Sequence, residues 1–332
     1  MSHPEIFRRT ALRLLAWLLA CLLVLAALVI IPLKTHKSPE PDPHFFEPRL
    51  TASPEPTLPP EAPPLELRDP NSPMPDEGMQ ALLDAFVGEH PGCWDIYVYN
   101  LSHGDFASVS TEEDKPMVAA SLIKLYIMAA VFERVQTGSL PYWDVFGSVR
   151  YMIDISDNYC ANYLIQRLGD GKTELGFDYI NAFSLAVGCE HTSIQRTMLD
   201  TDSGLENYTS AEDCALLLKK IYRCELVSPE YSNQMLELLK DQRVNDRIPA
   251  GLPEGVVCAH KTGDLTNICC GDAGIVFSPN ADYILCVISN GSDNDPQTIE
   301  DIAALSASIY EYFNPAPEET PAPEETVSAG DA

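Results

Sequence analysis

A serine and a lysine three positions apart form the first pair in this 332-residue chain whose side chains could carry out a reaction together. In Ser121-Leu122-Ile123-Lys124 a helical backbone would place the hydroxyl and the amine on one face, because residues i and i+3 are neighbours there. A serine attacks a carbonyl only when a base accepts its proton, and a lysine can be that base when burial or a nearby cation lowers its pKa. The same spacing also arises by chance, with an exposed serine and a solvated lysine. The surrounding run AASLIKLYIMAAVF is apolar, and the cost of burying a lysine there favours a functional pair.

Two further short motifs carry polar side chains of the right kind. Ser156-Asp157-Asn158 stands at the break between two helical patterns, where it is also typical of an ordinary helix N-terminus. Lys261-Thr262-Gly263 lies in a strand-like run, and its small last residue would let a substrate backbone lie against the strand edge. Neither motif identifies a site by itself.

Together and in this order, the three motifs resemble the signature set of class A β-lactamases and penicillin-binding proteins. The resemblance extends over nearly all of residues 76–313, and the stretch 248–253 (IPAGLP) is similar to the family's approach to its Lys-Thr-Gly strand. It implies acyl transfer through a covalent serine intermediate, with a β-lactam or a D-alanyl-D-alanine peptide as substrate and with no cofactor.

The resemblance also implies four catalytic residues. Ser121 would attack the substrate carbonyl and become acylated, with Lys124 as its base or electrostatic partner. Ser156 would relay a proton to the leaving nitrogen. Lys261 would hold Ser156 and add positive potential for an anionic substrate.

The implied substrate-binding residues are Asn158, Thr262, Gly263, Asp264 and Thr266. Asn158 would hydrogen-bond the substrate amide, and the two threonines would bind its carboxylate. The backbone N–H groups of Ser121 and Asp264 would form the oxyanion hole, in which one donor contributes about 3 kcal/mol to the transition state. Asp157 would have a structural role in its loop.

The chain departs from the family pattern where class A enzymes carry the glutamate that activates the deacylating water, within Arg-x-Glu-x-x-Leu-Asn. The best match, Arg196 to Asp200, places Met198 at the glutamate position, and a thioether cannot accept a proton from water. Asp200, Asp202 or Glu206 could substitute from another direction.

Two other departures concern the surroundings of the cleft. Only 35 positions separate residue 121 from residue 156, fewer than in familiar relatives, which indicates a trimmed helical lobe. Cys269-Cys270 stands on the strand where many relatives place an arginine, and Arg247 is a candidate to supply that charge.

The segments outside residues 76–313 predict a membrane tether. Residues 14–33 contain no charge and are long enough to cross a bilayer as a helix, and Arg8, Arg9 and Arg13 favour a cytoplasmic segment 1–13. We therefore expect an uncleaved, single-pass signal anchor in the cell membrane of a bacterium, with the catalytic domain extracytoplasmic. Residues 34–75 contain 13 prolines and predict a semi-rigid spacer, and residues 314–332 predict a disordered tail with a repeated PAPEET sequence.

Hydrophobic periodicity places the motifs within one α+β domain. Strand-like runs occur near both ends, at 93–100, 106–110, 256–262, 270–277 and 283–290. Helical patterns lie at 76–90, 121–136, 142–153, 156–168, 177–187, 211–222, 228–240 and 296–313. The simplest architecture is an antiparallel sheet built from the N- and C-terminal segments and flanked by helices, with a mostly helical second lobe.

Composition excludes some classes of protein. With 21 Lys+Arg against 49 Asp+Glu the chain lacks the basic surface that nucleic acids or anionic membranes require. The ten cysteines show no C-x-x-C pair, so we expect no metal site. Cys21 falls in the anchor, which leaves an odd number outside and at least one thiol free or paired between chains.

Three functions remain open from the sequence. The complete motif set with Met198 favours a β-lactam-reactive serine hydrolase with slow deacylation. The tether and spacer favour a peptidoglycan D-alanyl-D-alanine carboxypeptidase or transpeptidase, which shares the same acylation chemistry. The third is a catalytically weak binding or sensor module of the cell envelope. Such a module could lose Ser121 and the two lysines without consequence, so their presence in this sequence argues against it.

Overall fold

The computed structural model describes residues 74–112, 115–292 and 295–316. The predicted cytoplasmic segment, the anchor, nearly all of the spacer and most of the tail lie outside these residues. Among the described residues, no helix combines the length and apolarity needed to cross a membrane. Asn314, assigned to the tail from sequence, hydrogen-bonds to the backbone of Asn280 and thus lies at the edge of the folded domain.

A six-stranded sheet joins segments from both ends of the domain, as predicted. Its order is β1 (Met74–Pro75), β3 (Asp105–Ser110), β2 (Cys93–Asn100), β8 (Tyr283–Asn290), β7 (Cys269–Phe277) and β6 (Val257–Leu265). All neighbours are antiparallel except the two-residue β1, which runs parallel to β3. The predicted fold class is confirmed, with β6 at one edge of the sheet.

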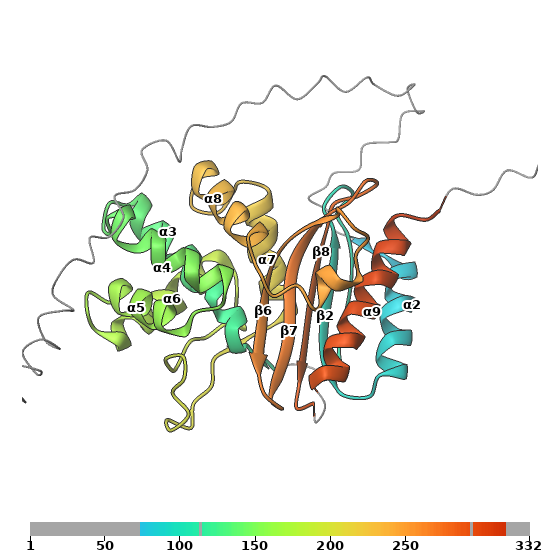
Figure 1. Cartoon of the computed structure of the whole chain (residues 1–332), viewed down its shortest axis with the longest axis horizontal. Helices are drawn as coiled ribbons and strands as arrows, with labels where there is room; N and C mark the ends of the chain where they lie inside the picture. The colour runs from blue at the N-terminus through green and yellow to red at the C-terminus, as the bar shows by residue number, and fades with distance from the viewer. Residues whose placement is uncertain (1–73, 113–114, 293–294, 317–332) are drawn as a thin grey trace, which may run out of the picture. The chain divides into compact units, whose positions relative to one another are not determined.

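Helices cover the sheet on both faces (Figure 1). α2 (Glu77–Glu89) and α9 (Asp295–Phe313) pack against one face, where Ile96 and Val98 join their apolar side chains. Tyr97 and Tyr99 point to the opposite face because side chains alternate along a strand. That face packs against α7 (Ala211–Tyr222).

The second lobe is helical and is built around α3 (Lys124–Gln136), in which ten of thirteen residues are buried. A helix that is apolar on all sides must be surrounded. The surrounding helices are α4 (Tyr142–Asp154), α5 (Asn158–Leu168), α6 (Thr173–Val187), α7 and α8 (Pro229–Lys240). Helix α3 is therefore the rigid axis from which Lys124 projects. A short 3₁₀ turn, η1 (Ala120–Ile123), precedes it, where the sequence predicted α-helix from residue 121.

A long loop between α6 and α7 returns to the sheet side through a two-stranded ribbon that the sequence did not predict. Within it, β5 (Tyr208–Thr209) pairs with β4 (Met117–Val118) directly before η1. Asn207 fastens the loop, since its Oδ1 accepts from the N–H groups of Gln195 and Arg196 at 2.8 and 3.1 Å. The loop and the turn that carries Ser121 are thus tied together.

Candidate active site

Lys124 Nζ lies at the centre of a cluster of polar atoms from three segments. It is 2.9 Å from Ser121 Oγ and 3.1 Å from Ser156 Oγ. It also donates to the Ser156 carbonyl oxygen and to Asn158 Oδ1, both at 2.7 Å. The side chain is fully buried, so these contacts replace the water that an ammonium group would otherwise bind. The amine is fixed beside the Ser121 hydroxyl.

The turn that carries Ser121 lies directly against β6. A Cβ at Gly263 would stand 2.9 Å from Leu122 Cγ and 3.1 Å from the Ala119 carbonyl oxygen, so only glycine permits this approach. Gly263, directly before Asp264, therefore lies against the two residues that flank Ala120 and Ser121. Ala120 has φ +43°, a conformation that L-residues rarely adopt and that surrounding contacts must maintain.

The second and third motifs meet at the hydroxyl of Ser156. Lys261 Nζ donates to Ser156 Oγ at 3.0 Å and to the Thr262 carbonyl oxygen at 2.8 Å. Ser156 itself has φ +58°, which presents both its Oγ and its carbonyl oxygen to the lysines. A continuous chain of hydrogen bonds therefore runs from Ser121 through Lys124 and Ser156 to Lys261.

Burial lowers the pKa of both lysine amines. It lowers the pKa of Lys124 to about 8, against the opposing attraction of the Asp157 carboxylate. Burial and then the nearby Lys124 ammonium lower the pKa of Lys261 to about 7. A fraction of the Lys124 amine is therefore neutral and available as a base near neutral pH.

Asp157 stabilises the start of a helix, whereas Asn158 contacts Lys124. Asp157 is the N-cap of α5, and its Oδ1 accepts from Cys160 N at 2.7 Å. Hydrogen bonds from the backbone N–H groups of Cys160 and Tyr159 lower the pKa of the Asp157 carboxyl. The helix-cap reading of Ser156-Asp157-Asn158 thus holds for Asp157 alone, while its two neighbours face Lys124.

The residues near the end of β6 differ in position. Thr262 is buried beside Lys261, whereas Thr266 is exposed in the turn after the strand. The Asp264 carboxylate pairs with the guanidinium of Arg247, which is buried and also donates to Asp246 Oδ1 at 3.0 Å. Arg247 therefore lies at this end of β6 with its guanidinium paired to two carboxylates, and Cys270 Sγ accepts from its Nε at 3.4 Å.

Met198 is buried in the loop between α6 and β5, facing the helical core. Its backbone is held by Asn162 of α5, which accepts from Met198 N at 2.7 Å and donates to Met198 O at 2.9 Å. No signal in the sequence marked Asn162, since a lone polar residue within a helical pattern has many uses. These two hydrogen bonds hold the backbone of Met198 against Asn162, which lies one helical turn after Asn158 on α5.

Two of the three nearby carboxylates, those of Glu206 and Asp200, hold the loop. Glu206 forms an ion pair with Arg196 at 2.8 Å. Asp200 Oδ1 accepts from the N–H groups of Asp202 and Ser203, both at 3.1 Å, which closes a turn. Asp202 is exposed in that turn. These contacts hold the carboxylates of Glu206 and Asp200 in the loop, and Met198 is the side chain at the glutamate position.

A buried polar network behind Lys261 was also missed from the sequence. His260 Nδ1 is 2.9 Å from Asp272 Oδ1, and its Nε2 is 2.9 Å from Asn245 Oδ1. Asp272 Oδ2 accepts from Ile248 N at 3.2 Å, so this carboxylate connects β7 to the segment after Arg247. Two polar residues in otherwise apolar strand runs were the available signal.

Within the part of the chain that the structure describes, the nine cysteines are free thiols and no group of His, Cys, Asp or Glu side chains has the arrangement of a metal site. The side chains that meet at the site are those of Ser121, the two lysines and Ser156 between them.

Comparisons with known proteins found a matching family model and similar solved structures. A family model described as "Beta-lactamase enzyme family" matches residues 78–146 and 144–313. The solved structure of PBP-A is 30% identical, with a TM-score of 0.64, and the match covers 73% of this chain and 98% of PBP-A. A mutant of PBP-A described as an acyl-enzyme complex with penicillin-G matches with 30% identity, a TM-score of 0.64, and 72% and 97% coverage. A β-lactamase from Sphaerobacter thermophilus DSM 20745 shares the fold at 21% identity, with a TM-score of 0.61 and 71% and 98% coverage. No curated protein matches.

Proposed function

Because this chain belongs to the β-lactamase enzyme family, we propose that it is a serine hydrolase that reacts with β-lactams through an acyl-enzyme at Ser121. The observation that carries the proposal is the contact of 2.9 Å between the buried Lys124 Nζ and Ser121 Oγ. A nucleophile and its base within hydrogen-bond reach, with the base oriented by further groups, is the arrangement that covalent catalysis requires.

Acylation follows from the hydrogen-bond chain. Neutral Lys124 takes the proton of Ser121 Oγ as that oxygen attacks the lactam carbonyl carbon. The carbonyl oxygen becomes an oxyanion that the N–H groups of Ser121 and Asp264 stabilise. The C–N bond of the ring then breaks, and the nitrogen takes the proton of Ser156 Oγ, which Lys261 replaces.

Substrate binding uses the remaining polar groups of the cleft. Asn158 offers an amide beside Lys124 for the substrate amide, while Lys261 supplies positive charge for a carboxylate. Thr262 and Gly263 contribute the strand edge. Thr266 lies further along the exposed turn and would contact only the outer part of a substrate.

Deacylation is slow in this proposal because Met198 replaces the glutamate that would activate water. A thioether has no basic lone pair for a water proton at neutral pH, and the carboxylates of Glu206 and Asp200 are held in the loop. The intermediate should therefore accumulate.

The same features favour a D-alanyl-D-alanine carboxypeptidase or transpeptidase as a second candidate. PBP-A is a penicillin-binding protein by its name, and it is more similar to this chain than the β-lactamase described above, at 30% against 21% identity. Residues 14–33 and 34–75 would tether and extend the domain outside the cell membrane, near peptidoglycan.

Burst kinetics test the proposal. A chromogenic cephalosporin mixed with the purified full chain should give one rapid equivalent of product per enzyme, followed by much slower turnover. Ser121→Ala should abolish the burst. Rapid steady turnover without a burst would contradict slow deacylation, and no reaction at all would contradict the β-lactam proposal.

Release of D-alanine from a muropeptide, measured on the same preparation, separates the two candidates. A peptidase should release D-alanine by a Ser121-dependent reaction that penicillin blocks. A β-lactam hydrolase should leave the muropeptide unchanged.

A further inference from the structure

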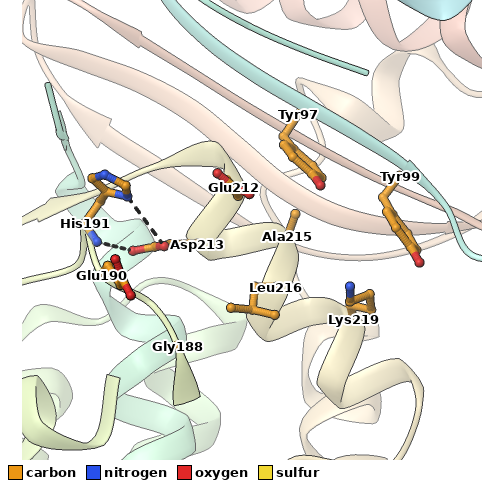
Figure 2. Close-up of a pocket in the computed structure, with 10 residues that line it drawn as sticks. All are labelled: Tyr97, Tyr99, Gly188, Glu190, His191, Glu212, Asp213, Ala215, Leu216 and Lys219. Carbon is orange, nitrogen blue, oxygen red and sulfur yellow. Dashed lines mark hydrogen bonds and ion pairs between the residues drawn. The ribbon is translucent and has the colours of Figure 1, made fainter. Parts of the chain in front are cut away.

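A cavity of about 220 Å³ lies between α7, β2 and the segment that follows α6. Figure 2 shows its lining, with Glu212, Ala215 and Lys219 along one side of α7 and the rings of Tyr97 and Tyr99 on the strand above. β2 is separated from β6 by β8 and β7, which is about 14 Å at three strand spacings. The cavity is therefore distinct from the candidate active site.

One end of the cavity is acidic. Glu190 and Glu212 line it together with Asp213, whose Oδ2 already accepts from Thr192 Oγ1 at 2.7 Å and from His191 N at 2.9 Å. Glu212 is exposed and forms no ion pair among the described residues. Burial and the negative charge of Glu212 raise the pKa of nearby Asp95, while a hydrogen bond from the backbone of Ala211 lowers it. His191 Nδ1 lies 3.9 Å from Asp213 Oδ1, whereas neither Glu190 nor Glu212 has an ion-pair partner among the described residues.

The other end is basic. Lys219 Nζ lies 4.6 Å from the centre of the Tyr99 ring, and Arg223 donates to the Tyr99 hydroxyl at 3.3 Å. Burial, followed by repulsion from Arg223 and Lys220, lowers the pKa of Lys219. Lys219 has no carboxylate within ion-pair distance among the described residues, so this end would accept an anion.

The middle of the cavity is apolar and has a defined length. Residues 212 and 219 are seven positions apart on one helix, which is about 10 Å of rise. Ala215 and Leu216 occupy the helix between them, and Tyr97 faces them from β2. An aliphatic chain can lie along this trough with its ends at opposite charges.

We propose that this cavity binds an ω-amino carboxylate, with its ammonium at Glu190 and Glu212, its chain along Tyr97 and Ala215, and its carboxylate at Lys219. The same chemistry occurs in a free ω-amino acid and in a carboxyl-terminal lysine, whose side-chain ammonium and α-carboxylate are similarly spaced. The site is independent of the proposed hydrolase activity.

Matched small molecules test the charge pattern. Calorimetry and ligand-observed saturation-transfer NMR on the full chain compare 6-aminohexanoate with hexanoate and hexylamine, which each keep one of its charges. The zwitterion should bind at least about tenfold more tightly than either, which corresponds to about 1.4 kcal/mol. Nα-acetyl-lysine and free 6-aminohexanoate distinguish a chain terminus from a free amino acid as the better ligand.

Substitutions locate the binding. Glu212→Gln and Lys219→Gln should each weaken 6-aminohexanoate binding about tenfold or more. Glu174→Gln, in the first turn of α6, and Lys240→Gln, whose Nζ lies 4.9 Å from the centre of the Phe277 ring, are the matched controls and should leave affinity unchanged. Thermal melting checks that all four variants fold. Equal binding of the three molecules, no binding of the zwitterion, or unchanged affinity in folded Glu212→Gln and Lys219→Gln would overturn the proposal.

Discussion

Exchange of one atom at Asn158 should shift the pH dependence of acylation. Asn158 Oδ1 accepts from Lys124 Nζ at 2.7 Å, so Asn158→Asp would place a carboxylate in direct contact with the amine. An opposite charge at this distance favours the ammonium form and raises a pKa by about 1–3 units. The base would then be protonated over a wider pH range.

The magnitude follows from the present pKa of Lys124, which burial lowers to about 8. At pH 7 about one molecule in ten then has the neutral amine. A rise of one unit reduces this to about one in a hundred, and a rise of two units to about one in a thousand. We therefore expect acylation at pH 7 to slow by about 10- to 100-fold, with a smaller deficit as the pH rises.

The assay is the rate constant for acylation by penicillin, read from intact mass along the acidic side of the pH profile. Asn158→Leu is the paired variant, because loss of the acceptor disfavours the ammonium and should move the acidic limb to lower pH. If both variants move the limb in the same direction, or neither moves it, Lys124 is not the base whose titration limits acylation.

Three other predictions follow from the same geometry. Met198→Glu should speed deacylation by about 100-fold or more, because it adds a base that can activate water. Met198→Gln should not speed it. Equal lifetimes of the two acyl-enzymes would contradict the role given to this position. Gly263→Ala should lower the free energy of unfolding, measured with urea, by about 1–3 kcal/mol and should slow acylation. Gly147→Ala, which has open space around it in α4, should do neither. Normal acylation by a folded Gly263→Ala variant would refute the need for close approach of β6. The free energy of unfolding of the wild type should rise with pH between about pH 7 and 10, because over that window the unfolded lysine binds a proton that the buried Lys261 amine has lost. This rise should be steeper than in Lys261→Met by up to about 1.4 kcal/mol per pH unit. Identical pH slopes in the two proteins would show that Lys261 is not buried as an amine of lowered pKa.

The sequence was sufficient to predict most helices and strands of the domain and the contact between Ser121 and Lys124. Spacing of i and i+3 places Ser121 beside Lys124 whether the backbone is a 3₁₀ turn or an α-helix, so that contact is local. The strand and helix patterns are long and strongly periodic, which is why the sheet from both termini could be predicted.

The remaining features depend on contacts between distant segments. Lys261 reaches Ser156 across 105 positions, and no local pattern gives the 3.0 Å between their side chains. The positive φ at Ala120 and Ser156 is imposed by packing, since neither residue type favours it. Glu206 was a candidate base from its position in the sequence, and only its contact with Arg196 shows that it holds the loop.

The central claim is that Ser121 is the nucleophile, and peptide mapping tests it most directly. The full chain is mixed with penicillin, quenched in acid and digested, and the acylated peptide is identified by mass spectrometry. The account predicts one acyl group, on the peptide that contains Ser121, and none in Ser121→Ala. A covalent adduct on any other residue, or an adduct that persists in Ser121→Ala, would contradict it.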